Sequence, residues 1–177
     1  SPAWGGIREL LIRTRTNGTL PKGPMPAVTR TFETIATASV SKSAPHAREM
    51  MLLKPGDGIT MNRDRLFANA KARALALAEN YRPPDRPVFQ LPGTSARLSL
   101  EATVETLQRQ GKSSAYDVTV AGALASVVSG GCADMTRAVT EERMLALERE
   151  ALMPLVRRPE TRARIEHLLA TGKPLRN

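Results

Sequence analysis

The chain has 177 residues, 41% of them apolar and 24% charged, an ordinary balance for a globular protein of one domain or two small ones. Its single cysteine, Cys132, excludes an internal disulfide framework, and no apolar run approaches the roughly 20 residues that cross a bilayer. The net charge is +9, but the 20 arginines and six lysines are scattered, which argues against a nucleic-acid partner. We expect a soluble, cytoplasmic, mainly helical protein whose core is built from Ala, Leu, Val, Ile and Met.

The first part of the chain predicts four helices separated by loops rich in glycine and proline. Apolar residues at helical spacing predict one helix over about residues 5–15 and a second that begins at Pro26. Ser43 is a good cap for a short third helix. The clearest helix follows, with a cap at Asn62. Its apolar residues recur every three or four positions: Leu66, Ala70, Ala74, Leu77 and Tyr81.

A proline-rich segment divides the chain. Residues 83–97 include four prolines and show no helical period at their start, so we expect an extended connector between two helical units, residues 1–82 and residues 98–177. In the second unit, Ser114 with Asp117 predicts a capping box.

Two further helix starts are expected in the second unit. Thr140, followed by acidic residues, is a strong start for one helix, because negative charge favours the positive end of the helix dipole. Pro159 begins the last helix, which we expect to end at Gly172.

A complete catalytic or metal site is not evident. His46 and His167 lack a second ligand at metal-binding spacing, so we interpret both as surface or structural residues. Cys132 is interpreted as a small buried residue rather than an activated thiol. Four carboxylates are expected on a solvated, salt-bridged helix face, not as an acid–base pair. They are Glu141, Glu142, Glu148 and Glu150.

Several segments nevertheless resemble known enzymes. Residues 1–10, Ser-Pro-Ala-Trp-Gly-Gly-Ile-Arg-Glu-Leu, resemble the Pro-Gly-x-Gly-Gly-x-x-x-Leu segment of the enoyl-CoA hydratase (crotonase) superfamily. Residues 58–66, 76–81 and 164–177 resemble the C-terminal end of bacterial multifunctional fatty-acid oxidation proteins, which join a 3-hydroxyacyl-CoA dehydrogenase to a crotonase-like domain.

The resemblance implies a function for the parent enzyme. Residues 1–82 would be the closing helices of a crotonase-like unit, and residues 98–177 a helical extension. The parent would hydrate a 2-enoyl-CoA thioester, as a lyase, and oxidise the 3-hydroxyacyl-CoA with NAD, as an oxidoreductase. The family's catalytic positions and its NAD domain precede the segment matched by residues 1–10. The chain also begins without methionine, so we expect a cut chain that is inactive alone.

The resemblance also implies a substrate-binding site and partners. Ala3, Trp4, Gly5 and Gly6 would form the helix entry at the acyl-CoA site, although Ala3 replaces a glycine and Trp4 a small residue. We expect no catalytic residue, metal or cofactor in the chain itself. Its partners would be acyl-CoA, the N-terminal domains of the same parent and, in a homo-oligomer, further copies. The +9 charge suits the phosphates of CoA.

The alternative hypothesis is a non-catalytic helical protein-interaction module. Its apolar faces, with Met50 and Met51, would then mark a groove for a partner. Thioester binding separates the two hypotheses, because only the enzyme requires it.

Overall fold

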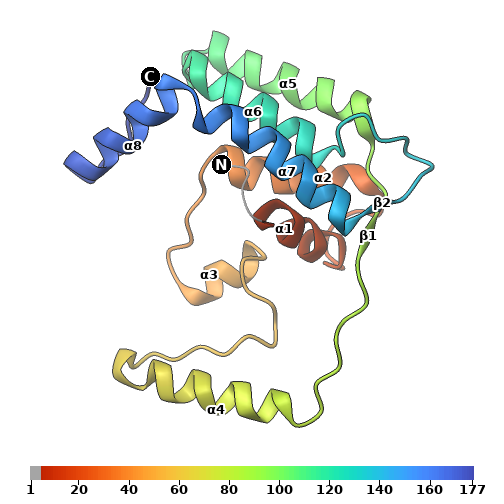
Figure 1. Cartoon of the computed structure of the whole chain (residues 1–177), viewed down its shortest axis with the longest axis vertical. Helices are drawn as coiled ribbons and strands as arrows, with labels where there is room; N and C mark the ends of the chain where they lie inside the picture. Colours follow the sequence, from red (N-terminus) through yellow and green to blue (C-terminus); the bar gives the residue numbers. More distant parts are fainter. Residues whose placement is uncertain (1–4) are drawn as a thin grey trace. The chain divides into compact units, whose positions relative to one another are not determined.

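Helices dominate the computed structural model of the chain, which describes residues 5–177 and confirms the predicted mainly α fold (Figure 1). Across these residues there are eight α-helices, one 3-10 helix and two strands of two residues each. In chain order they are α1 Gly6–Arg15, α2 Pro24–Ala36, α3 Ala44–Glu49, η1 Arg63–Arg65, α4 Leu66–Ala78, β1 Val88–Phe89, α5 Gly93–Arg109, α6 Ala115–Val128, β2 Val139–Thr140, α7 Glu141–Val156 and α8 Pro159–Thr171.

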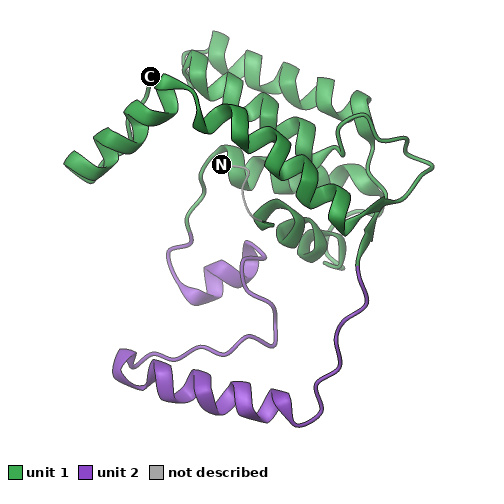
Figure 2. Cartoon of the chain, in the orientation of Figure 1, with its two compact units in different colours: residues 1–40, 87–177 green, residues 41–86 purple. Residues whose placement is uncertain are grey.

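The chain folds into two units, one of which is discontinuous in sequence (Figure 2). Unit 1 consists of residues 1–40, described from residue 5 onward, together with residues 87–177. Unit 2 consists of residues 41–86. This division differs from the predicted one, because α1 and α2 belong with the helices that follow the proline-rich segment. The predicted connector, residues 83–97, is itself shared between the two units.

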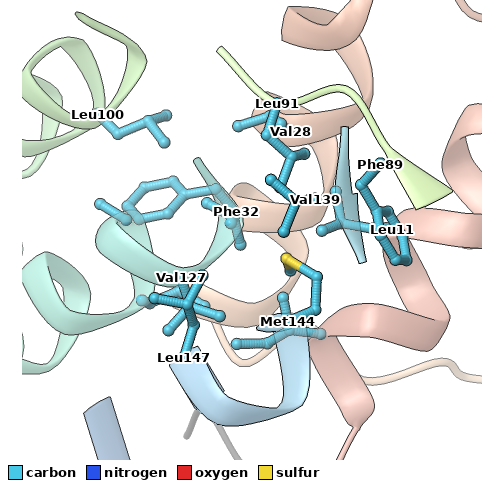
Figure 3. Close-up of a cluster of buried hydrophobic side chains, with 14 of the residues drawn as sticks. Leu11, Val28, Phe32, Phe89, Leu91, Leu100, Val127, Val139, Met144 and Leu147 are labelled. Atoms are coloured by element: carbon cyan, nitrogen blue, oxygen red, sulfur yellow. The ribbon is translucent and has the colours of Figure 1, made fainter. Parts of the chain in front are cut away.

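The core of unit 1 lies among α1, α2, α5, α6 and α7 (Figure 3). Phe32 and Phe89 are 4% and 0% exposed, so phenylalanine takes part in a core that was expected to hold only aliphatic residues and methionine. The buried residues of the cluster are Ile7, Leu11, Val28, Phe32, Phe89, Leu91, Leu100, Val104, Ala121, Leu124, Ala125, Val127, Val128, Val139, Met144 and Leu147.

The proline-rich segment contributes directly to this core. β1 and β2 pair antiparallel, with Val88 opposite Thr140 and Phe89 opposite Val139. Phe89 and Leu91 are 0% and 1% exposed. The segment is extended, as its prolines predict, but from residue 87 onward it is not a linker between units. Its two apolar side chains bind it to the core, since burying a Phe or Leu stabilises by about 1.5–3 kcal/mol each.

Gly93 fixes the start of α5, five residues before the predicted unit begins. Its N–H donates to the carbonyl of Ser129 at 2.9 Å, and its φ of 66° lies in the left-handed region. A Cβ at this position would lie 2.1 Å from the carbonyl oxygen of Ala133. Both the backbone conformation and the close approach therefore require glycine here.

Three of the predicted helix caps are confirmed, whereas Asn62 caps the 3-10 helix η1 and α4 itself begins after Arg65 without a side-chain cap. The Ser43 hydroxyl accepts a hydrogen bond from the N–H of His46 at 3.2 Å. Ser114 and Asp117 form the predicted capping box, with distances of 2.9 and 3.1 Å. The Thr140 hydroxyl caps α7. Each cap satisfies backbone donors that the helix itself leaves unpaired.

The second helix begins earlier than expected. α2 starts at Pro24, not Pro26, because Gly23 turns the chain with a φ of 115° and Pro24 suits the first helical position. Its apolar residues face the core as predicted, with Val28 and Phe32 both buried.

Unit 2 contains α3, η1 and α4. After α3, Asp57 closes a turn, since its carboxylate accepts the N–H of Lys54 at 2.8 Å and its carbonyl accepts Arg48 at the same distance. Met50 and Met51 are each 7% exposed, so the expectation that they mark an exposed partner groove is wrong. In contrast, none of the residues of α4 is buried.

Candidate functional site at the start of helix α1

A buried carboxylate holds the N-terminus of α1. Gly5 adopts a left-handed conformation, with a φ of 84°, and its N–H donates to Oε2 of Glu148 at 2.7 Å. The N–H of Arg8 donates to Oε1 of the same carboxylate at 2.9 Å. Glu148 comes from α7 and is only 1% exposed. The two hydrogen bonds and the positive end of the helix dipole together compensate the burial of this charge.

A second carboxylate of α7 reaches the same turn of α1. Glu141 forms a salt bridge with the guanidinium of Arg8, which also lies 3.5 Å from Glu9. Glu141 and Glu148 are seven residues apart, two helical turns, so they lie on the same side of α7. The result is a polar junction between α1 and α7 in which backbone and side chain of Arg8 are both bound.

The predicted acyl-CoA residues meet this junction. Ala3 and Trp4 lie outside the described residues. Gly5 is buried and Gly6 is exposed. The Gly5 N–H, one of the donors that the glycine-rich helix entry was expected to offer to a ligand, is bound to Glu148. A ligand oxygen that used this donor would have to displace the carboxylate. The assignment of residues 3–6 to substrate binding stays a prediction.

Glu148 was expected on a solvated face and is instead among the most deeply buried side chains, so that expectation is wrong for this residue. The signal was present in the sequence. Glu148 follows Met144 by four positions and precedes Leu155 by seven, which places it on the buried side of α7. A charged residue can be buried at this position of α7 because the N-terminus of α1 supplies its carboxylate with two hydrogen-bond donors.

The two histidines occupy separate places in the fold. His46 lies on α3, where its Nδ1 accepts the N–H of Lys42 at 3.1 Å. His167 lies half-buried on α8. Among residues 5–177 no three His, Cys, Asp or Glu side chains are grouped so as to hold a metal ion.

Cys132 is exposed, contrary to the expectation of a buried residue. It lines a pocket of about 500 Å³ together with Asp134, Arg137 and Arg143. Arg143 also forms a salt bridge with Glu150 at 2.9 Å. The pocket therefore brings a thiol and two guanidinium groups to one surface of unit 1.

A second pocket of about 380 Å³ lies between the end of α1 and the start of α2, and it is also basic. Arg15 and Lys22 are among its lining residues. Arg15 donates to the carbonyl of Val88 at 2.7 Å and lies over the ring of Phe89, 5.7 Å from its centroid. This arginine thus joins α1 to β1 while it contributes positive charge to the pocket.

A third polar cluster joins α8 to the capping box of α6. Arg164 donates to Asp117 at 2.8 Å and lies over the ring of Tyr116, 4.8 Å from its centroid. Burial acts to raise the pKa of Asp117, but hydrogen bonds from Ser114 and Arg164 outweigh it and hold the pKa below 3.8. The carboxylate is therefore charged at neutral pH.

Comparison with known proteins finds a relative that aligns with almost the full length of the chain. The chain is 40% identical, over 177 residues, to a protein of Bacillus subtilis (strain 168) described as a probable 3-hydroxyacyl-CoA dehydrogenase. The alignment covers 99% of this chain and 22% of that protein. The chain therefore spans about a fifth of the length of the relative that it matches.

The relative agrees with the dehydrogenase part of the resemblance described above, whereas the crotonase and hydratase part finds no support in the comparisons. No family model and no solved structure matches the chain. Within the described residues, no helix is both long and apolar enough to cross a membrane.

Proposed function

We propose that this chain is the helical part of a 3-hydroxyacyl-CoA dehydrogenase. The observation that carries the proposal is the 40% identity to the Bacillus subtilis protein over 99% of the chain. In this enzyme the remaining polypeptide binds NAD and the reacting end of the substrate. The carbon that bears the 3-hydroxyl gives a hydride to NAD⁺, the hydroxyl loses a proton, and the 3-oxoacyl-CoA forms.

In this enzyme the role of the chain is structural, as a helical unit that packs beside the part that binds the substrate. The polar site around Glu148 joins α1 to α7, and both oxygens of its carboxylate accept backbone N–H groups of the chain itself. The two basic pockets support contact with a phosphate-bearing ligand, since guanidinium and ammonium groups bind phosphate oxygens well. The +9 charge favours the same class of ligand, a CoA thioester.

Further features of the parent enzyme belong to the same proposal, namely hydration of an enoyl-CoA and a location in the cytoplasm. In this proposal, residues 1–82 close a crotonase-like unit that hydrates a 2-enoyl-CoA, and residues 3–6 border the acyl-CoA site. The parent enzyme is cytoplasmic and forms homo-oligomers. The hydration and the acyl-CoA site are supported by the segments at residues 1–10, 58–66, 76–81 and 164–177 that resemble multifunctional fatty-acid oxidation proteins, and the cytoplasmic location by the single cysteine, which fits a reducing compartment.

A hybrid enzyme tests the proposal. The region of the Bacillus subtilis relative that matches this chain is replaced by the 177 residues, and NADH formation from 3-hydroxybutyryl-CoA and NAD⁺ is followed by absorbance. We expect the hybrid to keep activity within about tenfold of the unmodified relative, a loss of at most about 1.4 kcal/mol in transition-state stabilisation. The chain alone should form no NADH.

Two results would contradict the proposal. A folded hybrid without activity, beside an active unmodified relative, would show that this chain does not serve a dehydrogenase. NADH formation by the chain alone would show that it contains the catalytic centre itself. Hydration of crotonyl-CoA by the hybrid, measured in parallel, tests the hydratase part separately.

A non-catalytic interaction module remains the second candidate, and the exposure of α4 favours it. The discriminating measurement is thioester binding to the hybrid. A protein that only binds other proteins has no affinity for 3-hydroxybutyryl-CoA beyond that of the unreplaced part.

A further inference from the structure

One side of α4 is an uninterrupted apolar surface. With about 100° between successive residues, six side chains occupy an arc about 120° wide that includes no polar residue. We call this surface the α4 stripe. Its members are Leu66, Phe67, Ala70, Ala74, Leu77 and Ala78.

Within unit 2 taken by itself, no residue covers the α4 stripe. Leu66, Phe67 and Leu77 are 52%, 82% and 55% exposed, and the three alanines are exposed as well. An isolated helix of 13 residues is marginally stable in water, and helices in proteins draw most of their stability from packing an apolar face. An apolar surface of this kind, rimmed by polar residues, marks an interaction site.

The shape of the stripe favours a protein partner. Its bulky residues lie near the ends of the helix, Leu66 and Phe67 at one end and Leu77 at the other, whereas the middle contains Ala70 and Ala74. Small side chains in the middle let another helix approach closely, because the interaxial distance depends on the residues at the contact. The same alanines offer little apolar area for insertion into a bilayer, which relies on bulky residues.

The charges at the edges of the stripe specify the partner further. Lys71 borders one edge and Arg73 the other. A two-fold pair of α4 helices would bring these cations face to face along both edges, whether the helices ran parallel or antiparallel, and like charges at such positions are repulsive. A surface with carboxylates along both rims is complementary instead.

We propose that the α4 stripe packs on an apolar surface with acidic rims in the part of the dehydrogenase polypeptide that lies outside these 177 residues. The inference rests on the proposed function, in which that polypeptide exists. The 22% coverage of the Bacillus subtilis relative leaves most of such an enzyme to supply the surface.

Amide hydrogen exchange of residues 66–78 tests the proposal, measured in the isolated chain and in the hybrid described above. We expect exchange to be at least about tenfold slower in the hybrid, because packing suppresses local opening. In the hybrid, Ala74→Arg should restore fast exchange. Ala72→Arg is the matched control, since it makes the same change on the opposite side of the same exposed helix and should leave exchange slow.

The outcomes separate this inference from the proposed function. Slow exchange in a hybrid that lacks dehydrogenase activity would support the docking and overturn the activity. Fast exchange in an active hybrid would overturn the docking alone. Should the hybrid not fold, the separately expressed remainder of the relative is added to the isolated chain, and slowed exchange of residues 66–78 is again the expected result.

Two measurements on the isolated chain address other occupants. Dimerisation that depends on concentration and is lost with Ala74→Arg would assign the stripe to a second copy of the chain and overturn the proposal. Sedimentation with anionic phospholipid vesicles, lost with the same substitution, would assign it to a membrane surface and overturn the proposal as well. We expect neither.

Discussion

Replacing Glu148 by glutamine should destabilise unit 1 more than any other exchange of similar size on α7. The carboxylate accepts the N–H of Gly5 at 2.7 Å and that of Arg8 at 2.9 Å through different oxygens. Glutamine has one carbonyl oxygen, so it satisfies only one donor and points its amide group at the other. The charge that complements the α1 dipole is lost at the same time.

The lost hydrogen bond and the lost charge together set the expected decrease in the free energy of unfolding. An unsatisfied buried donor costs about 1–3 kcal/mol, and a charge at a helix end contributes about 0.3–2 kcal/mol. Removing the charge also relieves part of its desolvation cost, which acts in the opposite direction. We therefore expect Glu148→Gln to lower the free energy of unfolding by about 2–3 kcal/mol, or the Tm by about 5–10 °C for a chain of this size.

The assay is thermal and urea unfolding followed by far-ultraviolet circular dichroism. Glu150→Gln is the matched control, because Glu150 lies on the same helix, its side chain is 59% exposed, and it forms a surface salt bridge with Arg143. Its effect should stay within about 0.5 kcal/mol. A Tm for Glu148→Gln within about 2 °C of wild type would refute the assignment of Glu148 as the link between α1 and α7.

Three further predictions concern unit 1. Gly93→Ala should lower the free energy of unfolding in urea by about 3 kcal/mol or more, because the new Cβ would lie 2.1 Å from the carbonyl oxygen of Ala133 at a φ of +66°. Gly122→Ala is the control. A Cβ there meets nothing within 4 Å, so this change should be neutral or stabilise by up to about 1 kcal/mol. Phe89→Ala should cost about 3–5 kcal/mol, because the ring is 0% exposed in the core; a loss below about 1 kcal/mol would contradict that placement. Asp117→Asn should lower the Tm at pH 7. Because the pKa of Asp117 in the folded protein lies below 3.8, the difference in Tm from wild type should shrink as the pH falls from 3.8 through the folded pKa. A difference in Tm that grows on acidification would contradict the lowered pKa.

The helix starts were predictable because they depend on neighbours in sequence. Ser43, Ser114 and Thr140 each cap a donor within the following three residues, so the pattern holds wherever the helix packs. The extended segment around Phe89 was also predicted as extended. Its burial was not, because the prolines describe the backbone and say nothing of which long-range partner the side chains meet.

The candidate site depended on long-range pairing. The glycines at the start of α1 indicate a helix entry with available donors, but the group that uses them, Glu148, is 143 positions away from Gly5. The helical spacing from Met144 and Leu155 places Glu148 on the buried side of α7, but its charge led to the prediction of a solvated position. For α4 the reverse holds. Its periodicity predicts the helix, while the exposure of the apolar side could not be deduced, since the same pattern serves a partner inside or outside the chain.

The insertion of unit 2 between the two segments of unit 1 has a consequence for how the sequence can vary. Folding unit 1 closes a loop of the 46 residues from 41 to 86, at an entropic cost of about 3 kcal/mol that depends only logarithmically on length. Halving or doubling the insertion would change that cost by only about 0.6 kcal/mol. The stability of unit 1 therefore sets little limit on the length of unit 2, and insertions or deletions that spare α4 can accumulate there while the core of unit 1 is kept.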